Sequence, residues 1–135
     1  MSKNILFVCK YNRFRSKTAE AFFKKYNKNK EFKAFSAGLL PGRYPLDSVQ
    51  VKIAKEFGIE LKGKPKPITT DLLRKIYSLI IVADNVPPEI FESKKYNVRE
   101  EVWNIQDTIN DEENEIRQII SKIEKRVINL VEGLK

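Results

Sequence analysis

The segment from Ser78 to Ala83 constrains the fold more than any other, because it contains four consecutive branched apolar residues, Leu79-Ile80-Ile81-Val82. A strand of this composition is apolar on both faces, as expected in the interior of a parallel sheet that helices cover on both sides. Asp84-Asn85 follows and supplies turn residues that end the strand. The segment therefore predicts an α/β fold built on a parallel sheet.

Strand and helix patterns alternate along the rest of the chain. We predict strands at 3–8, 32–36, 78–83 and 101–104, and helices at 16–28, 46–57, 70–76, 87–95 and 111–134. Ser16 is expected to cap the first helix. This order predicts one domain over residues 1–135, with a four-stranded, doubly wound parallel sheet flanked by helices on both faces. Ligands of such folds bind beyond the carboxyl ends of the strands.

Cys9 is the only cysteine, and it ends the first predicted strand. It opens a Cys-x5-Arg-Ser motif that closes with Arg15-Ser16 at the start of a helix. A loop in this position turns amide N–H groups toward an anion, and arginine adds a bidentate donor. We therefore predict that Cys9 is a nucleophile and that Arg15 and the loop amides bind phosphate. The predicted substrate-binding residues are Lys10, Tyr11, Asn12, Arg13, Phe14 and Arg15.

Histidine cannot activate the thiol, because the chain has none. A single cysteine without histidine also argues against a transition-metal site, and we expect neither metal nor cofactor. Activation is instead expected from the helix N-terminus, the loop amides and nearby cations. The Ser16 hydroxyl is expected to donate a hydrogen bond to the sulfur and to ease its later departure from phosphorus.

Asp107 follows the last predicted strand and lies at the same sheet edge as Cys9. In-line attack by Cys9 gives a cysteinyl-phosphate, which water then hydrolyses. Asp107 is the candidate general acid for the leaving oxygen and the candidate base toward the water. Ser36 and Asp84 end the second and third strands at this edge, and Asp84 is interpreted as a turn residue.

The net charge of +8 is unevenly distributed. Residues 1–66 hold 16 Lys or Arg against 5 Asp or Glu, whereas residues 67–135 hold 10 against 13. The positive half contains Cys9 and would attract phosphorylated substrates. For most of these lysines, however, a solvated surface is the better explanation. With no membrane-length apolar run and no signal peptide, we expect a cytoplasmic monomer without membrane or nucleic-acid partners.

The segment Val8-Cys9-x-x-Asn12-x-x-Arg15-Ser16 resembles the signature of the low-molecular-weight protein tyrosine phosphatases, whose fold is shared by thioredoxin-coupled arsenate reductases. Further similar motifs are Ser36-Ala37-Gly38, Pro45-x-Asp47, Gly58-Ile59, Val82-Ala83-Asp84 and the aspartate at Asp107. The resemblance implies strand order 2-1-3-4 and a phosphotyrosine-containing protein or a small phosphomonoester as substrate. It also implies that Asn12 supports the loop through hydrogen bonds that involve Ser16 and Ser36.

Several residues depart from the family pattern. Thr108 replaces a proline, and Ile109-Asn110 replace the aromatic pair that walls the phosphotyrosine pocket. Tyr11, Phe14 and Tyr44 are candidates for a substitute wall. The histidine that often joins the Asn-Ser network is absent, so the loop needs other support.

Two alternative functions stay open. Arsenate reduction would have to finish on an external thiol, because the chain has no cysteine besides Cys9 for an internal relay. A non-catalytic binder of phosphorylated or nucleic-acid partners would explain the basic half of the chain, but it has no use for a nucleophile with a positioned acid.

Overall fold

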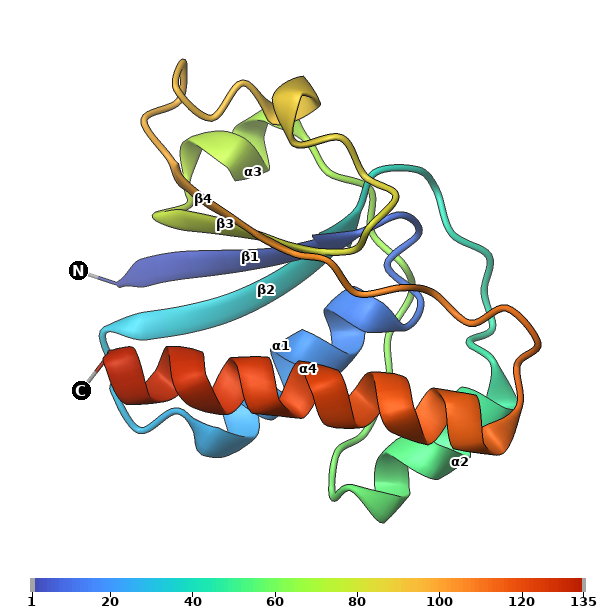
Figure 1. The fold of residues 1–135 in the computed structure, drawn as a ribbon. Helices are drawn as coiled ribbons and strands as arrows, with labels where there is room; N and C mark the ends of the chain where they lie inside the picture. The colour runs from blue at the N-terminus through green and yellow to red at the C-terminus, as the bar shows by residue number, and fades with distance from the viewer. Residues whose placement is uncertain (1, 135) are drawn as a thin grey trace.

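A computed structural model describes residues 2–134 and shows a four-stranded parallel sheet in the order β2-β1-β3-β4 (Figure 1). The strands are β1 (Lys3–Cys9), β2 (Phe32–Gly38), β3 (Ser78–Val82) and β4 (Arg99–Trp103). In β1, one of the two inner strands, Cys9 pairs with Gly38 of β2, and Val8 pairs with Ile81 of β3. The predicted fold class and strand order are confirmed.

Helices cover both faces of the sheet, as the sequence predicts. Helices α1 (Arg15–Tyr26), α2 (Ser48–Glu56) and α4 (Glu113–Gly133) pack on one face, and α3 (Thr70–Arg74) with the 3-10 turn η1 (Pro88–Phe91) lies on the other (Figure 1). No helix within residues 2–134 combines the length and apolarity needed to cross a membrane.

The two faces of β1 explain the two halves of the core, because successive side chains of a strand point to opposite sides. Ile5 and Phe7 join the cluster under α1 and α4, where Phe7 lies 5.8 Å from Trp103 between ring centroids. Leu6 and Val8 join the smaller cluster on the other face. The sheet is therefore buried on both faces, and its carboxyl edge carries Cys9.

Several predicted helix limits are wrong, including those of α2, which covers Ser48–Glu56 instead of 46–57. The segment 87–95 forms only the short η1 turn, because Glu92 adopts a left-handed backbone with φ of 49° and stops it. The last helix begins at Glu113 instead of 111, since Asp111 is also left-handed, with φ of 54°. Ser16 does not cap α1, which begins one residue earlier without a side-chain cap.

Candidate active site

The loop after β1 is held in shape by Asn12, which is fully buried and left-handed with φ of 55°. Its Nδ2 donates to Ser16 Oγ at 2.8 Å, and its Oδ1 accepts from the Lys66 amide at 2.9 Å. Gly38 leaves room for this loop, because a Cβ there would lie 2.6 Å from the Tyr11 carbonyl carbon. Two hydrogen bonds and one glycine thus fix a backbone conformation that most residues avoid.

The loop amides are free for a ligand. Within residues 2–134, none of the N–H groups of residues 10–14 donates to a backbone carbonyl, whereas the carbonyls of Cys9 and Lys10 accept from Leu39 and Leu40. Consecutive unpaired amides at the start of a helix form a binding site for anions. The loop is therefore anchored through its carbonyls and leaves its donors available.

Cys9 and Ser16 are in direct contact, with Sγ 3.0 Å from Oγ, and both residues are buried. A neutral thiol donates to this hydroxyl. Asn12 already occupies one lone pair of Ser16 Oγ, so the hydroxyl proton is available to an ionised sulfur. The arrangement can stabilise a thiolate without histidine.

Arg15 is only 2% exposed and connects the loop to the segments that follow β3 and β4. Nη1 donates to the Ile105 carbonyl at 2.8 Å, and Nη2 donates to Asn85 Oδ1 at 3.0 Å. The guanidinium also lies 3.7 Å from an Asp84 oxygen and 3.6 Å from Asp107 Oδ2. Asp84 therefore faces Arg15 in addition to ending its strand.

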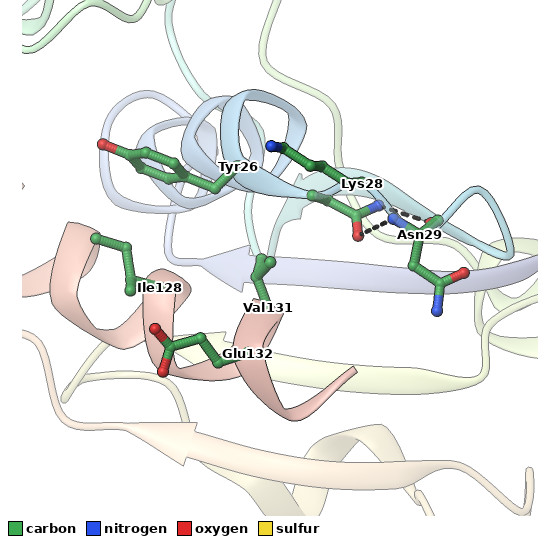
Figure 2. A pocket seen from close by; sticks show the side chains of 7 residues that line it. Tyr26, Lys28, Asn29, Ile128, Val131 and Glu132 are labelled. Carbon is green, nitrogen blue, oxygen red and sulfur yellow. Dashed lines mark hydrogen bonds between the residues drawn. The ribbon is translucent and has the colours of Figure 1, made fainter. Parts of the chain in front are cut away.

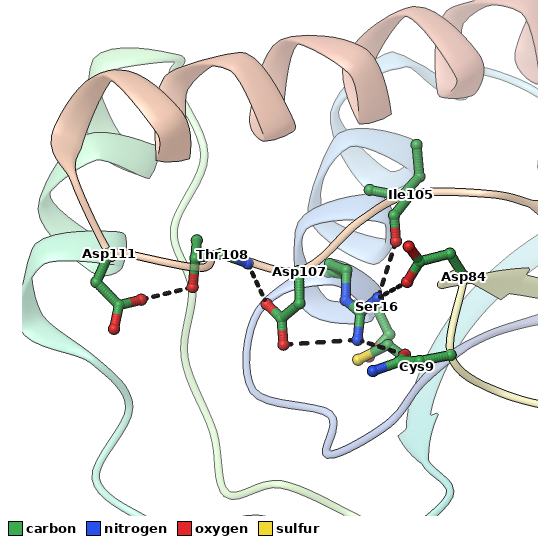
Figure 3. Close-up of polar contacts among 9 residues, drawn as sticks. Cys9, Ser16, Asp84, Ile105, Asp107, Thr108 and Asp111 are labelled. Carbon is green, nitrogen blue, oxygen red and sulfur yellow. Dashed lines mark hydrogen bonds and ion pairs between the residues drawn. The ribbon is translucent and has the colours of Figure 1, made fainter.

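Asp107 lies at the mouth of the site, partly exposed, and its Oδ1 accepts from the Thr108 amide at 2.8 Å (Figure 3). The Thr108 hydroxyl donates in turn to Asp111. A pocket of about 230 Å³ is lined by Cys9, Tyr11, Arg13, Phe14, Arg15, Asp47, Gln50, Asp107, Thr108 and Asp111. Cys9, Arg15 and Asp107 thus open onto one cavity.

The other predicted substrate-binding residues differ in position. Tyr11 is 38% exposed and lines the pocket, and buried Phe14 lines it while packing into the core. Arg13 also lines it, but its guanidinium is held by the carbonyls of Arg43 and Pro45, each at 2.9 Å. Lys10 and Tyr44 are not among the lining residues. Of the three candidate wall aromatics, Tyr11 and Phe14 reach the pocket.

The prediction that Ser36 takes part in the hydrogen bonds of Asn12 is wrong, because the Ser36 hydroxyl donates to Glu20 on α1. The place at Asn12 Oδ1 is taken by the backbone amide of Lys66. Sequence reasoning missed Asn85 as a partner of Arg15, and Asp47, Gln50 and Asp111 as pocket walls. A signal was present for Asn85, since it follows Asp84 at the carboxyl edge of the sheet.

A larger hollow of about 470 Å³ lies elsewhere, between the end of α1 and the last turns of α4 (Figure 2). Tyr26, Asn29, Ile128, Val131 and Glu132 are among its lining residues. It contains neither a thiol nor an arginine, so the smaller pocket around Cys9 is the candidate active site.

The sequence model of the family described as low molecular weight phosphotyrosine protein phosphatase matches residues 4–135. The chain belongs to this family. An arsenate reductase of Brevibacillus brevis is 31% identical over 134 residues, which cover 96% of this chain and 95% of the relative.

Two solved structures share the fold of this family member. The YwlE arginine phosphatase from Geobacillus stearothermophilus has a TM-score of 0.84 at 20% identity, covering 98% of this chain and 92% of that one. A protein tyrosine phosphatase from Entamoeba histolytica has a TM-score of 0.80 at 22% identity, covering 98% and 97%.

Proposed function

We propose that this protein is a phosphomonoester hydrolase that acts on phosphotyrosine through a cysteinyl-phosphate on Cys9. One observation carries the proposal: Cys9, Arg15 and Asp107, which lie at the end of β1, at the start of α1 and in the segment after β4, line the same pocket of about 230 Å³. A nucleophile, an anion-binding guanidinium and a carboxylic acid are the groups that phosphoryl transfer through an enzyme thiolate requires.

In the first step, the loop amides and Arg15 bind the three non-bridging oxygens of the phosphoryl group. Cys9 Sγ attacks phosphorus in line, and the bond to the leaving oxygen breaks. Asp107 donates its proton to that oxygen. The amide cradle fits the trigonal transition state better than the tetrahedral substrate, so binding is strongest where it accelerates the reaction.

In the second step, water attacks phosphorus and the S–P bond breaks. The Asp107 carboxylate takes the water proton, and inorganic phosphate is released. Cys9 leaves as a thiolate, which accepts the hydroxyl proton of Ser16, 3.0 Å away in the resting structure, as a hydrogen bond. This hydrogen bond makes the sulfur a better leaving group, so Ser16 acts mainly on the second step.

Replacing Asp107 with asparagine removes the proton donor and leaves the side chain almost the same size. We expect kcat to fall about 10²-fold or more for alkyl phosphates, which have poor leaving groups, and much less for p-nitrophenyl phosphate. Steady-state kinetics over a series of leaving groups measures this. Equal losses for good and poor leaving groups would argue against Asp107 as the acid.

The pocket walls favour one further candidate substrate. Asp47 and Asp111 line the pocket together with Asp107, so three carboxylates and Tyr11 border one small cavity. Tyr11 supports an aryl phosphate, whereas the carboxylates would favour a cationic group next to the phosphorus, as in phosphoarginine. One of the structures with the same fold is an arginine phosphatase.

Truncation of Tyr11 distinguishes between phosphotyrosine and phosphoarginine as the substrate. We expect Tyr11→Ala to raise KM for a phosphotyrosine peptide about fivefold through loss of ring packing, and to leave KM for a phosphoarginine peptide unchanged. Tyr44→Ala is the matched control, because Tyr44 is 53% exposed and is not among the residues that line the pocket. Equal effects of both variants, or faster wild-type turnover of phosphoarginine, would reassign the substrate.

Arsenate reduction is the competing activity, and the Brevibacillus brevis relative is named for it. Reduction of arsenate takes two electrons from two thiols, and Cys9 supplies only one. An external thiol would have to supply the other. Arsenate-dependent oxidation of added glutathione, without phosphatase turnover, would decide for this alternative.

A further inference from the structure

Residues 62–67, which we call the strap, form hydrogen bonds both to the catalytic loop and to the end of β2. The Lys66 amide donates to Asn12 Oδ1 at 2.9 Å, and the Lys66 carbonyl accepts from the Gly38 amide at 2.7 Å. Pro67 forms an isolated parallel bridge with Gly38. One end of the strap is therefore part of the support that holds Asn12 in its left-handed conformation.

The other end of the strap is held by Lys17, which follows Ser16 in the first turn of α1. Its Nζ donates to the Lys62 carbonyl at 3.1 Å, and the residue is only 6% exposed. Lysine is rarely buried to this degree, since the ammonium loses hydration. Five of the six strap residues are themselves exposed, all but Pro65, and Gly63 is left-handed with φ of 87°. An exposed segment of this kind needs an anchor to stay in place.

The charges around Lys17 agree with this position. Desolvation by burial lowers the pKa of Lys17, the carboxylate of Glu20 opposes the shift, and Lys66 adds to it. Negative charge on the Cys9 sulfur also opposes the shift. Lys17, Glu20, Lys24, Glu60, Lys62, Lys64 and Lys66 line a cavity of about 350 Å³ between α1 and the strap.

A continuous series of contacts leads from Lys17 to the thiol. Lys17 fixes the strap at Lys62, and the strap places the Lys66 amide on Asn12. Asn12 then donates to Ser16, whose Oγ contacts Cys9 Sγ. If the strap moves, Asn12 loses the partner of its Oδ1, and the Ser16 hydroxyl loses its orientation toward sulfur.

We propose that Lys17 is a positioning residue for the catalytic thiol: it fixes the strap at Lys62 and so keeps Asn12 and Ser16 aligned with Cys9. This supplies the support that histidine does not provide in this chain. The catalytic consequence rests on the proposed phosphatase function, whereas the structural consequence does not.

The test compares Lys17→Met with Lys25→Met. Methionine keeps most of the side-chain length and removes both the donor and the charge. Lys25 is a matched control, because it lies on the same helix and its Nζ donates to the Phe57 carbonyl at 2.8 Å. Amide hydrogen exchange is measured over residues 62–68, and kcat and KM are measured with p-nitrophenyl phosphate.

We expect Lys17→Met to raise exchange in the strap about tenfold and to lower kcat about tenfold with KM unchanged, while Lys25→Met does neither. Because Ser16 acts on the second step, Lys17→Met should also produce a burst of p-nitrophenol before the steady state. Lys17→Arg, which keeps a charged donor, should recover most of kcat.

A second variant keeps the proposal testable if Lys17→Met does not fold. Lys66→Pro removes the amide that donates to Asn12 and leaves Lys17 in place, and it should show the same fall in kcat and the same burst. Unchanged strap exchange in Lys17→Met, or a kcat that neither variant lowers, would overturn the proposal. Absence of wild-type turnover would instead reject the phosphatase function, and the exchange comparison would still test the strap.

Discussion

Replacing Cys9 with serine should abolish turnover of p-nitrophenyl phosphate, with a loss on the order of 10³-fold or more. A serine hydroxyl is hardly ionised near neutral pH, and the loop offers no histidine that could take its proton. The substitution is nearly isosteric at a position that is 2% exposed, so the midpoint of thermal unfolding should change little. Steady-state kinetics and a melting curve on the same preparation measure both effects.

The melting curve is the control for this variant, because a folded but inactive protein separates loss of the nucleophile from loss of structure. Sustained turnover by Cys9→Ser, above the level that contaminating phosphatases explain, would remove Cys9 from the mechanism.

Replacing Arg15 with lysine should lower kcat/KM by about 10²- to 10³-fold. Lysine offers a point charge in place of a planar fork, so it cannot bind two phosphate oxygens in parallel. The Arg15 guanidinium also contacts Asn85, Ile105 and two carboxylates. In the lysine variant these groups lose their hydrogen-bonding or ionic partner. We therefore expect unfolding by denaturant to show a loss of about 1 to 3 kcal/mol as well.

Arg13→Lys is the matched control for Arg15→Lys, since Arg13 lies in the same loop and lines the same pocket, but its guanidinium is bound to the carbonyls of Arg43 and Pro45. Its loss of kcat/KM should be much smaller. If the two variants lose equal activity, general loosening of the loop explains the result, and a specific role of Arg15 in phosphate binding is excluded.

Much of the fold follows from local patterns. The apolar run 79–82 needs burial on both faces, and the structure gives it the central position β3 with helices on each side. The hydrogen bond between Asn12 and Ser16 is implied by the resemblance to the family, and it is local, since the two residues lie four apart around a helix start.

Contacts between distant segments could not be predicted in this way. Ser36 bonds to Glu20 because α1 crosses β2 at that point, and no local pattern contains this crossing. The burial of Lys17 could not be predicted from sequence either, since a lysine at a helix start is ordinarily solvated. Lys17 is buried only because residues 62–67 pack over it in the folded protein.

The position of the acidic residues that line the pocket also depends on contacts between distant segments. Asp47 caps α2 through the amides of Val49 and Gln50, which a sequence pattern can indicate. Its place in the wall of the pocket that Cys9 also lines depends on how α2 packs against α4. Sequence therefore predicts the nucleophile and the anion-binding loop, while tertiary packing determines which substrates the walls of the pocket favour.

The most direct test of the central claim is rapid-quench mass spectrometry of the wild-type protein during turnover of p-nitrophenyl phosphate. Acid quenching within the first turnovers, followed by proteolysis, should yield a peptide containing Cys9 that carries the mass of one phosphoryl group and loses it as substrate is exhausted. Turnover at full rate with no phosphoryl group on that peptide, or with the group on another residue, would contradict the account.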